Sequence, residues 1–597
     1  MPSAEVFQQA ASQPVSVPLS DIDTYLWIRQ AAAAIHEGFV NYNNNFRRIT
    51  QRARAHFETR DWAGARTSLS ERIELYEKSV SRTLSTLRRQ FPEQADLLPR
   101  WPAIRAIYWS RVDDIPDGEF AKTFFNSVHR DILRDLHVDP TQVSDTADVV
   151  RAEAPLRYPA RQHNYVNWSN VRVVVRRLLG DFQFKTSYLD VEADVDFICA
   201  EIGRVVGADG TPDESVRRLE MMHDVFYQSS RAFVVGKMFW GTHNTPFVLA
   251  FENTNQGVRV EAALTSSDDV SVLFGFTRSY FMVDVEPVEG AVYFIKAMMP
   301  RKPLDELYTI LGRARQGKTE RYRSFFHHLH ACDDQFIHAA GDPGLVMLVF
   351  TLPSYDLVFK VIRDSFGYTK NISHDGVKSK YKFVFNHDRA GRLIDTQEFR
   401  NIEFPLAKFA PELLEELLIS TSNTVRIEAD QLVIDHLYSE RRVTPLNLYM
   451  REYAFDEARL ALLDYGQAIK DLAMTNIFAG DLLLKNFGVS RHGRVIFYDY
   501  DELCLVTECQ FRDLPEADNL DDEMSADNWF YVGPRDIFPQ EFIRFIAINE
   551  RLQEAFLAAH ADLLTADYWR DIKGLHLSNS APEVAPYYRL GTRRGMP

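Results

Sequence analysis

Cysteine is scarce in this chain of 597 residues. The four cysteines are Cys199, Cys332, Cys504 and Cys509, and no two of them have the CxxC spacing that is typical of structural zinc sites. A secreted scaffold held by disulfides would need more cysteines, placed closer together. The sequence therefore argues against a structural zinc site and against a disulfide scaffold, and it favours a reducing compartment, the cytoplasm.

Long apolar runs and an excess of basic residues are also lacking. No run of about 18 apolar residues occurs, so we expect no membrane-spanning helix. The first twenty residues do not combine a charged start with an apolar core, so we expect no signal peptide. The 68 basic residues against 84 acidic ones give a net charge of -16, and such a surface repels nucleic acid and anionic lipid. We expect a cytoplasmic protein that binds neither nucleic acid nor membrane.

The pattern of apolar residues predicts several domains with different secondary structure. A chain of this length exceeds a single hydrophobic core. Residues from about 20 to 135 have helical spacing, and helices are expected again from Leu304 to Cys332 and after Pro411. From Arg231 onward, short runs rich in Val, Phe and Tyr predict strands. These runs are RAFVVGKMFW, TPFVLAFE, VRVEAALT, SVLFGFTRSYFMVD and AVYFIKAM.

A glycine-containing turn between two predicted strands is the first candidate for chemistry. The turn AAGDPGL is followed by a strand, and the next strand ends in VFKVI and carries Lys360, sixteen positions after Gly344. Glycines let backbone N–H groups approach phosphates, and kinases place a phosphate-pairing lysine on the strand that follows their loop. The turn lacks the GxGxxG pattern and contains Asp342, so an ordinary hairpin turn is the alternative interpretation.

A second motif, FAGDLLLKNFGV, is more specific. Asn486 follows Asp481 by five positions, the spacing of the catalytic base and the metal-binding asparagine in kinases. A predicted hairpin then leads to Asp499 and Asp501 in DYDE, where kinases place a metal-binding aspartate. Oxygen ligands of this kind suit Mg²⁺. Aspartates also cap strand ends, but the agreement of residue types, spacing and strand order favours a kinase-like site.

Two further parts of a kinase site, the adenine-binding hinge and the glutamate partner of the lysine, have more than one candidate in the sequence. The apolar run from Leu446 to Met450 is predicted to be a short strand at the position of the adenine-binding hinge, or else a buried edge strand. No single glutamate can be assigned as the partner of Lys360. The candidates are Glu398, Glu412, Glu415 and Glu416.

Long segments of the chain resemble one family, the isocitrate dehydrogenase kinase/phosphatases. The segments are VMLVFTLPSYDLVFKVIRD, HDRAGRLIDTQEF, ERRVTPLN, NIFAGDLLLKNFGVSRHGRVIFYDYDE and FRDLP, with GKTERYR before them and HADLLTADYWR near the end. The resemblance implies an α+β protein in which residues 1–333 form a mainly helical regulatory domain and residues 334–597 a bilobal protein-kinase-like domain.

The resemblance also implies a function. One active site would phosphorylate a serine of isocitrate dehydrogenase with ATP and Mg²⁺, and would dephosphorylate it with ADP or ATP bound. The two reactions would control flux between the Krebs cycle and the glyoxylate bypass, with AMP as an allosteric effector.

Site residues follow from the resemblance by position. Lys360 would bind ATP, Asp481 would be the catalytic base, Asn486 and Asp499 would bind the metal, and Asp395 in DTQEF would serve the phosphatase reaction. The ATP loop would comprise Ala339, Ala340, Gly341, Asp342, Pro343, Gly344 and Leu345. This loop departs from the family pattern at Asp342-Pro343. For Asp395, a helix cap before Thr396 is the structural alternative.

Two other functions remain compatible with the kinase motifs. A small-molecule kinase would use the same aspartate, asparagine and aspartate. A catalytically inactive scaffold could bind nucleotide and a partner, although it would not need Lys360, Asp481, Asn486 and Asp499 together.

Overall fold

The computed structural model describes residues 22–92, 97–135, 159–166, 170–208, 216–275, 281–367, 372–387, 390–515, 530–546, 549–578 and 584. The chain forms two compact units, residues 1–49 with 71–144 and residues 50–70 with 145–597. Within the described part, no helix is both long enough and apolar enough to cross a bilayer.

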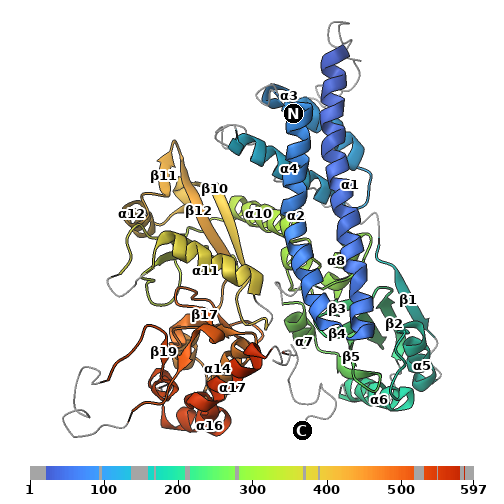
Figure 1. Ribbon diagram of the computed structural model, residues 1–597, viewed down its shortest axis with the longest axis vertical. Coiled ribbons are helices and arrows are strands. Elements are labelled where there is room, and N and C mark those ends of the chain that lie inside the picture. The colour runs from blue at the N-terminus through green and yellow to red at the C-terminus, as the bar shows by residue number, and fades with distance from the viewer. Residues whose placement is uncertain are drawn as a thin grey trace, which may run out of the picture. The chain divides into compact units, whose positions relative to one another are not determined.

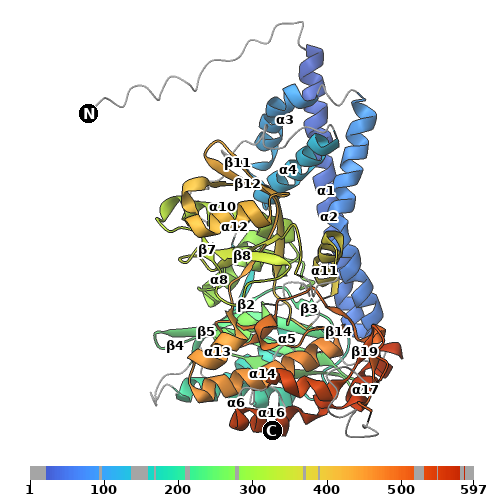
Figure 2. The same cartoon turned by 90° about the vertical axis from the view of Figure 1, so that its left-hand side faces the viewer.

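The N-terminal region is helical, as predicted. Its helices are α1 (Ile22–Thr59), α2 (Trp62–Gln90), α3 (Leu97–Val112) and α4 (Gly118–Asp135). Helices α1 and α2 run side by side in opposite directions (Figure 1, Figure 2). The first unit is held by an aromatic core in which Phe39 and Tyr42 of α1 contact Phe120 and Phe124 of α4. Such ring contacts stabilise the fold beyond what the burial of their apolar surface contributes.

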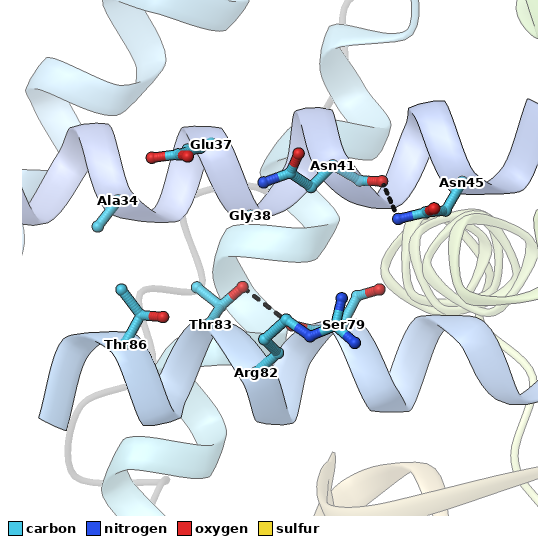
Figure 3. A pocket seen from close by; sticks show the side chains of 9 residues that line it. All are labelled: Ala34, Glu37, Gly38, Asn41, Asn45, Ser79, Arg82, Thr83 and Thr86. Carbon is cyan, nitrogen blue, oxygen red and sulfur yellow. Dashed lines mark hydrogen bonds between the residues drawn. The ribbon is translucent and has the colours of Figure 1, made fainter. Parts of the chain in front are cut away.

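Helices α1 and α2 approach closely at Gly38. A Cβ atom added there would lie 2.2 Å from the Thr83 hydroxyl, so any larger residue would have to displace the Thr83 side chain or push the helices apart. Next to this contact lies a small, partly open space of about 100 Å³ that is bordered by Glu37, Asn41 and Arg82 (Figure 3). A space of this size holds a few waters, whereas small-molecule pockets have about 300–1,000 Å³.

The second unit contains a sheet whose strand order is β1-β2-β4-β5-β6, with β3 paired to β4. The strands are β1 (Gln162–Val166), β2 (Val216–Met222), β3 (Phe226–Gln228), β4 (Arg231–Trp240), β5 (His243–Asn253) and β6 (Val258–Leu264). The helices of this part are α5 (Val171–Asp181), α6 (Val191–Ala208), α7 (Ser267–Leu273), α8 (Val288–Met298) and α9 (Leu304–Ile310). Strands β4 to β6 confirm three of the five predicted strands.

The strand prediction was wrong for the start of SVLFGFTRSYFMVD, where Ser271 to Leu273 end α7, and for AVYFIKAM, which lies within α8. Residues 276–280 of the first segment lie outside the described residues. Helix α8 is buried on nearly all sides, so its sequence lacks the polar face that would reveal a helical period. The start of α7 is capped by the Ser266 hydroxyl, which accepts hydrogen bonds from the backbone N–H groups of Asp268 and Asp269.

A second, antiparallel sheet has the order β10-β12-β9-β8-β7, with β11 paired to β12. Its strands are β7 (Ile337–His338), β8 (Met347–Thr351), β9 (Leu357–Ile362), β10 (Thr396–Pro405), β11 (Val425–Glu428) and β12 (Gln431–Arg441). Strands β7 to β9 were predicted, whereas β11 and β12 lie in the region after Pro411 where mainly helices were expected. We call the side covered by α11 (His374–His387) the front face (Figure 1). The back face shares a core with α10 (Ala314–Ala331) and α12 (Pro411–Ser420).

The rest of the second unit is mainly helical. Its helices are α13 (Leu446–Glu452), α14 (Phe455–Met474), α16 (Glu550–His560) and α17 (Ala566–Leu577). Its short strands are β13 (Thr444–Pro445), β14 (Ile477–Phe478), β15 (Phe487–Val489), β16 (Val495–Phe497), β17 (Cys504–Leu505), β18 (Gln510–Phe511) and β19 (Asp536–Ile537). Turns of 3-10 helix are η5 (Leu406–Lys408), η6 (Leu484–Asn486), η7 (Val506–Glu508), η8 (Pro539–Ile546) and η9 (Ala561–Leu564).

The predicted strand from Leu446 to Met450 was wrong, since this run is the first part of α13. Leu446 and Met450 are four positions apart and both enter the core, which is the spacing of one helix face. An antiparallel sheet followed by a helical lobe nevertheless confirms the predicted α+β class.

Candidate active site

The glycine turn joins β7 to β8 and lies open to solvent. Its seven residues, Ala339 to Leu345, are exposed from Ala340 onward. Gly341 has a φ of +118°, which side chains disfavour, and a Cβ at Gly344 would lie 2.5 Å from the Met347 carbonyl oxygen. The loop conformation therefore requires glycine at both positions and leaves its backbone accessible to a ligand.

Lys360 lies on β9 and is nearly buried, with 6% of its surface exposed. Its ammonium nitrogen is 2.7 Å from a carboxylate oxygen of Glu440 on β12 and donates to the Tyr498 carbonyl at 2.9 Å. The ammonium also lies 5.1 Å from the centroid of the Tyr498 ring. Lys360 thus connects the sheet to the segment that leads into Asp499.

Glu440 is the partner of Lys360, and all four predicted candidates were wrong. Glu416 instead binds Arg363, at 2.7 Å, and Glu398 binds Arg400, at 2.7 Å. Glu412 and Glu415 are exposed on α12, whose apolar side packs on the back face of the sheet.

The reason for the unexpected partner is the sequence of α11. Protein kinases supply the partner glutamate from the helix that follows the lysine strand. In this chain that helix is HDGVKSKYKFVFNH, whose only acidic residue, Asp375, lies in the first turn. The front face is instead contacted by Tyr381, which stacks on Tyr438 with ring centroids 3.9 Å apart.

The motif FAGDLLLKNFGV forms a loop between β14 and β15 that includes η6. Asp481 is partly exposed, and one of its carboxylate oxygens accepts a hydrogen bond from the Leu483 backbone N–H at 3.0 Å. Asn486 is buried and donates from its side-chain amide to the Asp481 carbonyl at 3.4 Å. The structure therefore brings together the predicted base and the predicted metal-binding asparagine.

The predicted hairpin is confirmed and places Asp499 beside these groups. Strands β15 and β16 pair with Phe487 opposite Phe497, and the Tyr498 N–H donates to the Asn486 carbonyl at 3.1 Å. The Tyr498 carbonyl accepts from Lys360, as described above. Asp499, the next residue, thus follows a segment that is bonded to both halves of the site.

The ionisable groups of the site shift one another's pKa values. Burial raises the pKa of the Glu440 carboxyl, and the Lys360 ammonium opposes this shift while Asp499 adds to it. Burial likewise raises the pKa of the Tyr498 hydroxyl, with a contribution from Asp499. The carboxylate of Asp499 is therefore near enough to Glu440 and Tyr498 to oppose further negative charge, an arrangement that a cation would relieve.

Asn486 and Asp499 offer the oxygen donors that Mg²⁺ prefers. The amide nitrogen of Asn486 is bonded to the Asp481 carbonyl, so the amide oxygen is the atom left to face a cation. No cluster of three or more His, Cys, Asp or Glu side chains suited to a metal occurs among the described residues. Two protein ligands beside phosphates are nevertheless typical of Mg²⁺ sites, which take their remaining ligands from phosphate and water.

Asp395 faces away from these groups. It precedes strand β10, so the alternative of a helix cap was wrong. Its carboxylate is buried and lies 2.7 Å from the guanidinium of Arg321 on α10, with the Gln397 amide at 3.3 Å. The adjacent Thr396 points the other way and donates to Glu440 at 2.8 Å. The role of Asp395 in dephosphorylation stays a prediction.

Comparisons with known proteins cover nearly the whole chain. The family model for the isocitrate dehydrogenase kinase/phosphatase (AceK) regulatory domain matches residues 32–333, and the model for its kinase domain matches residues 334–589. Isocitrate dehydrogenase kinase/phosphatase from Xanthomonas campestris pv. campestris (strain 8004) is 43% identical over 556 residues, which cover 93% of this chain and 96% of that protein. The protein of the same name from Anaeromyxobacter sp. (strain Fw109-5) is 44% identical over 560 residues, with the same coverage.

The chain belongs to the isocitrate dehydrogenase kinase/phosphatase family. The predicted family, fold class and enzyme class, a protein kinase and phosphatase, are thereby confirmed. The glycine loop, Lys360 and the aspartate–asparagine loop had been predicted from the sequence, and their roles stay predictions, whereas Glu440 as the partner of Lys360 had been missed. The short apolar runs LVI and LY in QLVIDHLYSER, rich in β-branched and aromatic residues, were the signal that could have revealed strand β12.

Proposed function

We propose that ATP-dependent phosphorylation of a serine of isocitrate dehydrogenase takes place where the β7–β12 sheet meets the catalytic loop. The observation that carries this proposal is the position of the Lys360 ammonium. It is shared between Glu440 on the sheet and the Tyr498 carbonyl next to Asp499. A lysine held in this way joins the loop, strand and aspartate that kinases use on ATP.

The residues divide the chemistry between them. The backbone of the loop from Ala339 to Leu345 would contact the phosphates, and the Lys360 ammonium would neutralise part of their charge. The Asp481 carboxylate, oriented by the Leu483 N–H, would accept the proton of the substrate serine hydroxyl as its oxygen takes the phosphoryl group. Asn486 and Asp499 would hold Mg²⁺, which when bound offsets phosphate charge.

The reverse reaction needs a further group, because its nucleophile is water. Asp395 is proposed for this role by the resemblance of DTQEF to the family motif, with ADP or ATP bound at the same loop. In the structure its carboxylate is paired with Arg321. Asp395 would therefore bind water either while it remains paired with Arg321 or after that pair has separated. The balance of the two reactions would control flux between the Krebs cycle and the glyoxylate bypass, with AMP as an effector.

Transfer of labelled phosphate from ATP to purified isocitrate dehydrogenase tests the proposal directly. We expect Mg²⁺-dependent labelling of the protein, and release of phosphate from the labelled protein when nucleotide is added. A chain that consumed ATP only with a small-molecule acceptor would be a small-molecule kinase. A chain that bound ATP and isocitrate dehydrogenase without any transfer would be a scaffold, and either result would contradict the proposal.

A further inference from the structure

The two faces of strands β10 and β12 carry different groups. Thr396 pairs with Glu440 across the sheet, and Lys360 pairs with Tyr438. Because side chains alternate along a strand, Thr396, Glu440 and Lys360 share the front face. Asp395, which precedes Thr396, and Arg441, which follows Glu440, therefore belong to the back face.

On the front face, both carboxylate oxygens of Glu440 are bonded. One accepts from the Thr396 hydroxyl at 2.8 Å, and the other is 2.7 Å from the Lys360 ammonium. The side chain of Glu440 is 1% exposed, so water cannot replace either partner. A small displacement of β12 or of the start of β10 would therefore break the contact that orients Lys360.

On the back face, six buried or nearly buried side chains alternate in charge. Arg321 lies 2.7 Å from both Asp305 and Asp395, through different nitrogens. Arg441 lies 2.5 Å from Glu306 and 3.4 Å from Asp305. Lys302 completes the chain at 2.8 Å from Glu306. Three positive and three negative groups thus connect α9 and α10 to the sheet.

Two of these six charged residues, Asp395 and Arg441, are sequence neighbours of residues that make the front-face contacts. Asp395 directly precedes Thr396, and Arg441 directly follows Glu440. The guanidinium of Arg321 also approaches the Ser439 carbonyl, at 3.5 Å, on the other side of Glu440. The back-face charges therefore hold the backbone of β10 and β12 at the positions from which Thr396 and Glu440 project.

We infer that Arg321 of α10 is a positioning residue for phosphoryl transfer, acting from the back face of the sheet through Glu440 on Lys360. The inference rests on the proposed nucleotide site at Lys360. A planar guanidinium can bind Asp305 and Asp395 at once, which an ammonium cannot do with the same geometry. The exact placement of Glu440 thus depends on arginine at this position, and not on positive charge alone.

The test is a double-mutant cycle in the full chain. Arg321→Lys keeps the positive charge at this buried position but loses the simultaneous contact of one guanidinium with Asp305 and Asp395. We expect its kcat for phosphorylation of isocitrate dehydrogenase to fall roughly 10- to 100-fold at saturating ATP, the cost of a small misplacement of a catalytic group, with the KM for the protein substrate unchanged. Glu440→Gln should lower kcat by a comparable factor.

The decisive result is the double variant. If Arg321 acts through Glu440, Arg321→Lys in the Glu440→Gln background costs nothing further, because the contact it positions is already lost. Multiplicative losses would overturn the inference, since a general effect on folding or on another group would add independently. Arg426→Lys is the matched control, because Arg426 lies on β11 of the same sheet and pairs, within the described part of the chain, with the partly exposed Glu428 and Asp435.

Two outcomes separate this inference from the proposed site. Parent rates in both Lys360→Met and Glu440→Gln would contradict the site itself. Low rates in those variants with a parent rate in Arg321→Lys would contradict the inference alone. If Arg321→Lys does not fold, the same cycle with Arg441→Lys decides the question, because Arg441 lies closer to the surface and anchors the same strand.

Discussion

At the scale of single residues, the site depends on how the Lys360 ammonium is held. In protein kinases its partner glutamate comes from a helix, so movement of that helix can make or break the pair. Here the partner, Glu440, lies on β12, which is hydrogen-bonded to β9 and β10 on its two sides. The pair is thus built into the sheet, and its formation does not depend on the position of α11.

The two aspartates of the catalytic loop and hairpin should differ in what their loss does. In Asp481→Asn the amide oxygen can still accept from the Leu483 N–H, so only the base is lost, and we expect kcat to fall about 10²- to 10⁴-fold. Asp499→Asn should also reduce activity and raise the Mg²⁺ concentration needed for half-maximal rate. Labelled-phosphate transfer across a Mg²⁺ titration measures both.

Asp456→Asn is the control for these variants, because Asp456 is exposed in the first turn of α14. It should retain the parent rate and Mg²⁺ dependence. A loss smaller than about tenfold in Asp481→Asn would contradict its assignment as the base.

A third aspartate, Asp395, should separate the two reactions. In Asp395→Asn one oxygen can still accept from Arg321, so the anchor of β10 is largely kept while the negative charge is lost. We expect release of phosphate from phosphorylated isocitrate dehydrogenase to fall much more than phosphorylation. Rates in both directions on the same preparation are the measurement, and equal losses would mean that Asp395 serves only as an anchor.

At the scale of elements, the sequence predicts what local patterns determine. Strands β7 to β9, the glycine turn and the β15–β16 hairpin were predicted because short apolar runs and turn residues are encoded within a few positions. Helix α8 was mistaken for a strand because burial on nearly all sides removes the period that distinguishes a helix, and α7 has only seven residues, too few to show that period. The partner of Lys360 could not be predicted, because it depends on the pairing of β9 with β12 and so on contacts between distant segments.

The close approach of α1 and α2 gives a prediction about stability. Gly38→Ala would place a Cβ 2.2 Å from the Thr83 hydroxyl, so we expect the free energy of unfolding to fall by about 1–3 kcal/mol, the usual cost of overpacking. Thermal or denaturant unfolding followed by circular dichroism measures the change. Adding Thr83→Ala should recover part of it by removing the clashing atoms.

Gly203→Ala on α6 is the matched control for this substitution. A Cβ at Gly203 would meet no atom within 4 Å, and alanine favours helix more than glycine does. We expect a gain of roughly 0.5–1 kcal/mol there. Equal effects of the two alanines would show that Gly38 is not needed for close packing.

At the scale of the whole molecule, the back face of the catalytic sheet joins parts of the chain that the family models assign to different domains. Helix α10 lies within residues 32–333, which match the regulatory model. Its Phe325 and Leu329 nevertheless share a core with Phe359 of β9. The boundary at residue 333 stays a prediction. Helix α10 and the sheet belong to the same compact unit, so α10 can influence the site through packing and through Arg321.

The proposal that one nucleotide site serves both activities makes a prediction for the molecule as a whole. If dephosphorylation also needs nucleotide at the glycine loop, Lys360→Met should reduce phosphorylation and dephosphorylation together, each by roughly 10²-fold or more, the cost of losing a positioned catalytic group. The chain should still fold, because methionine fills similar space and Glu440, whose pKa burial already raises, can take up a proton. Lys382→Met, on the exposed side of α11, should leave both rates unchanged. Circular dichroism checks the fold, and the two rates are measured on the same protein with labelled isocitrate dehydrogenase. Loss of phosphorylation with dephosphorylation at the parent rate would mean that the two reactions use different nucleotide contacts.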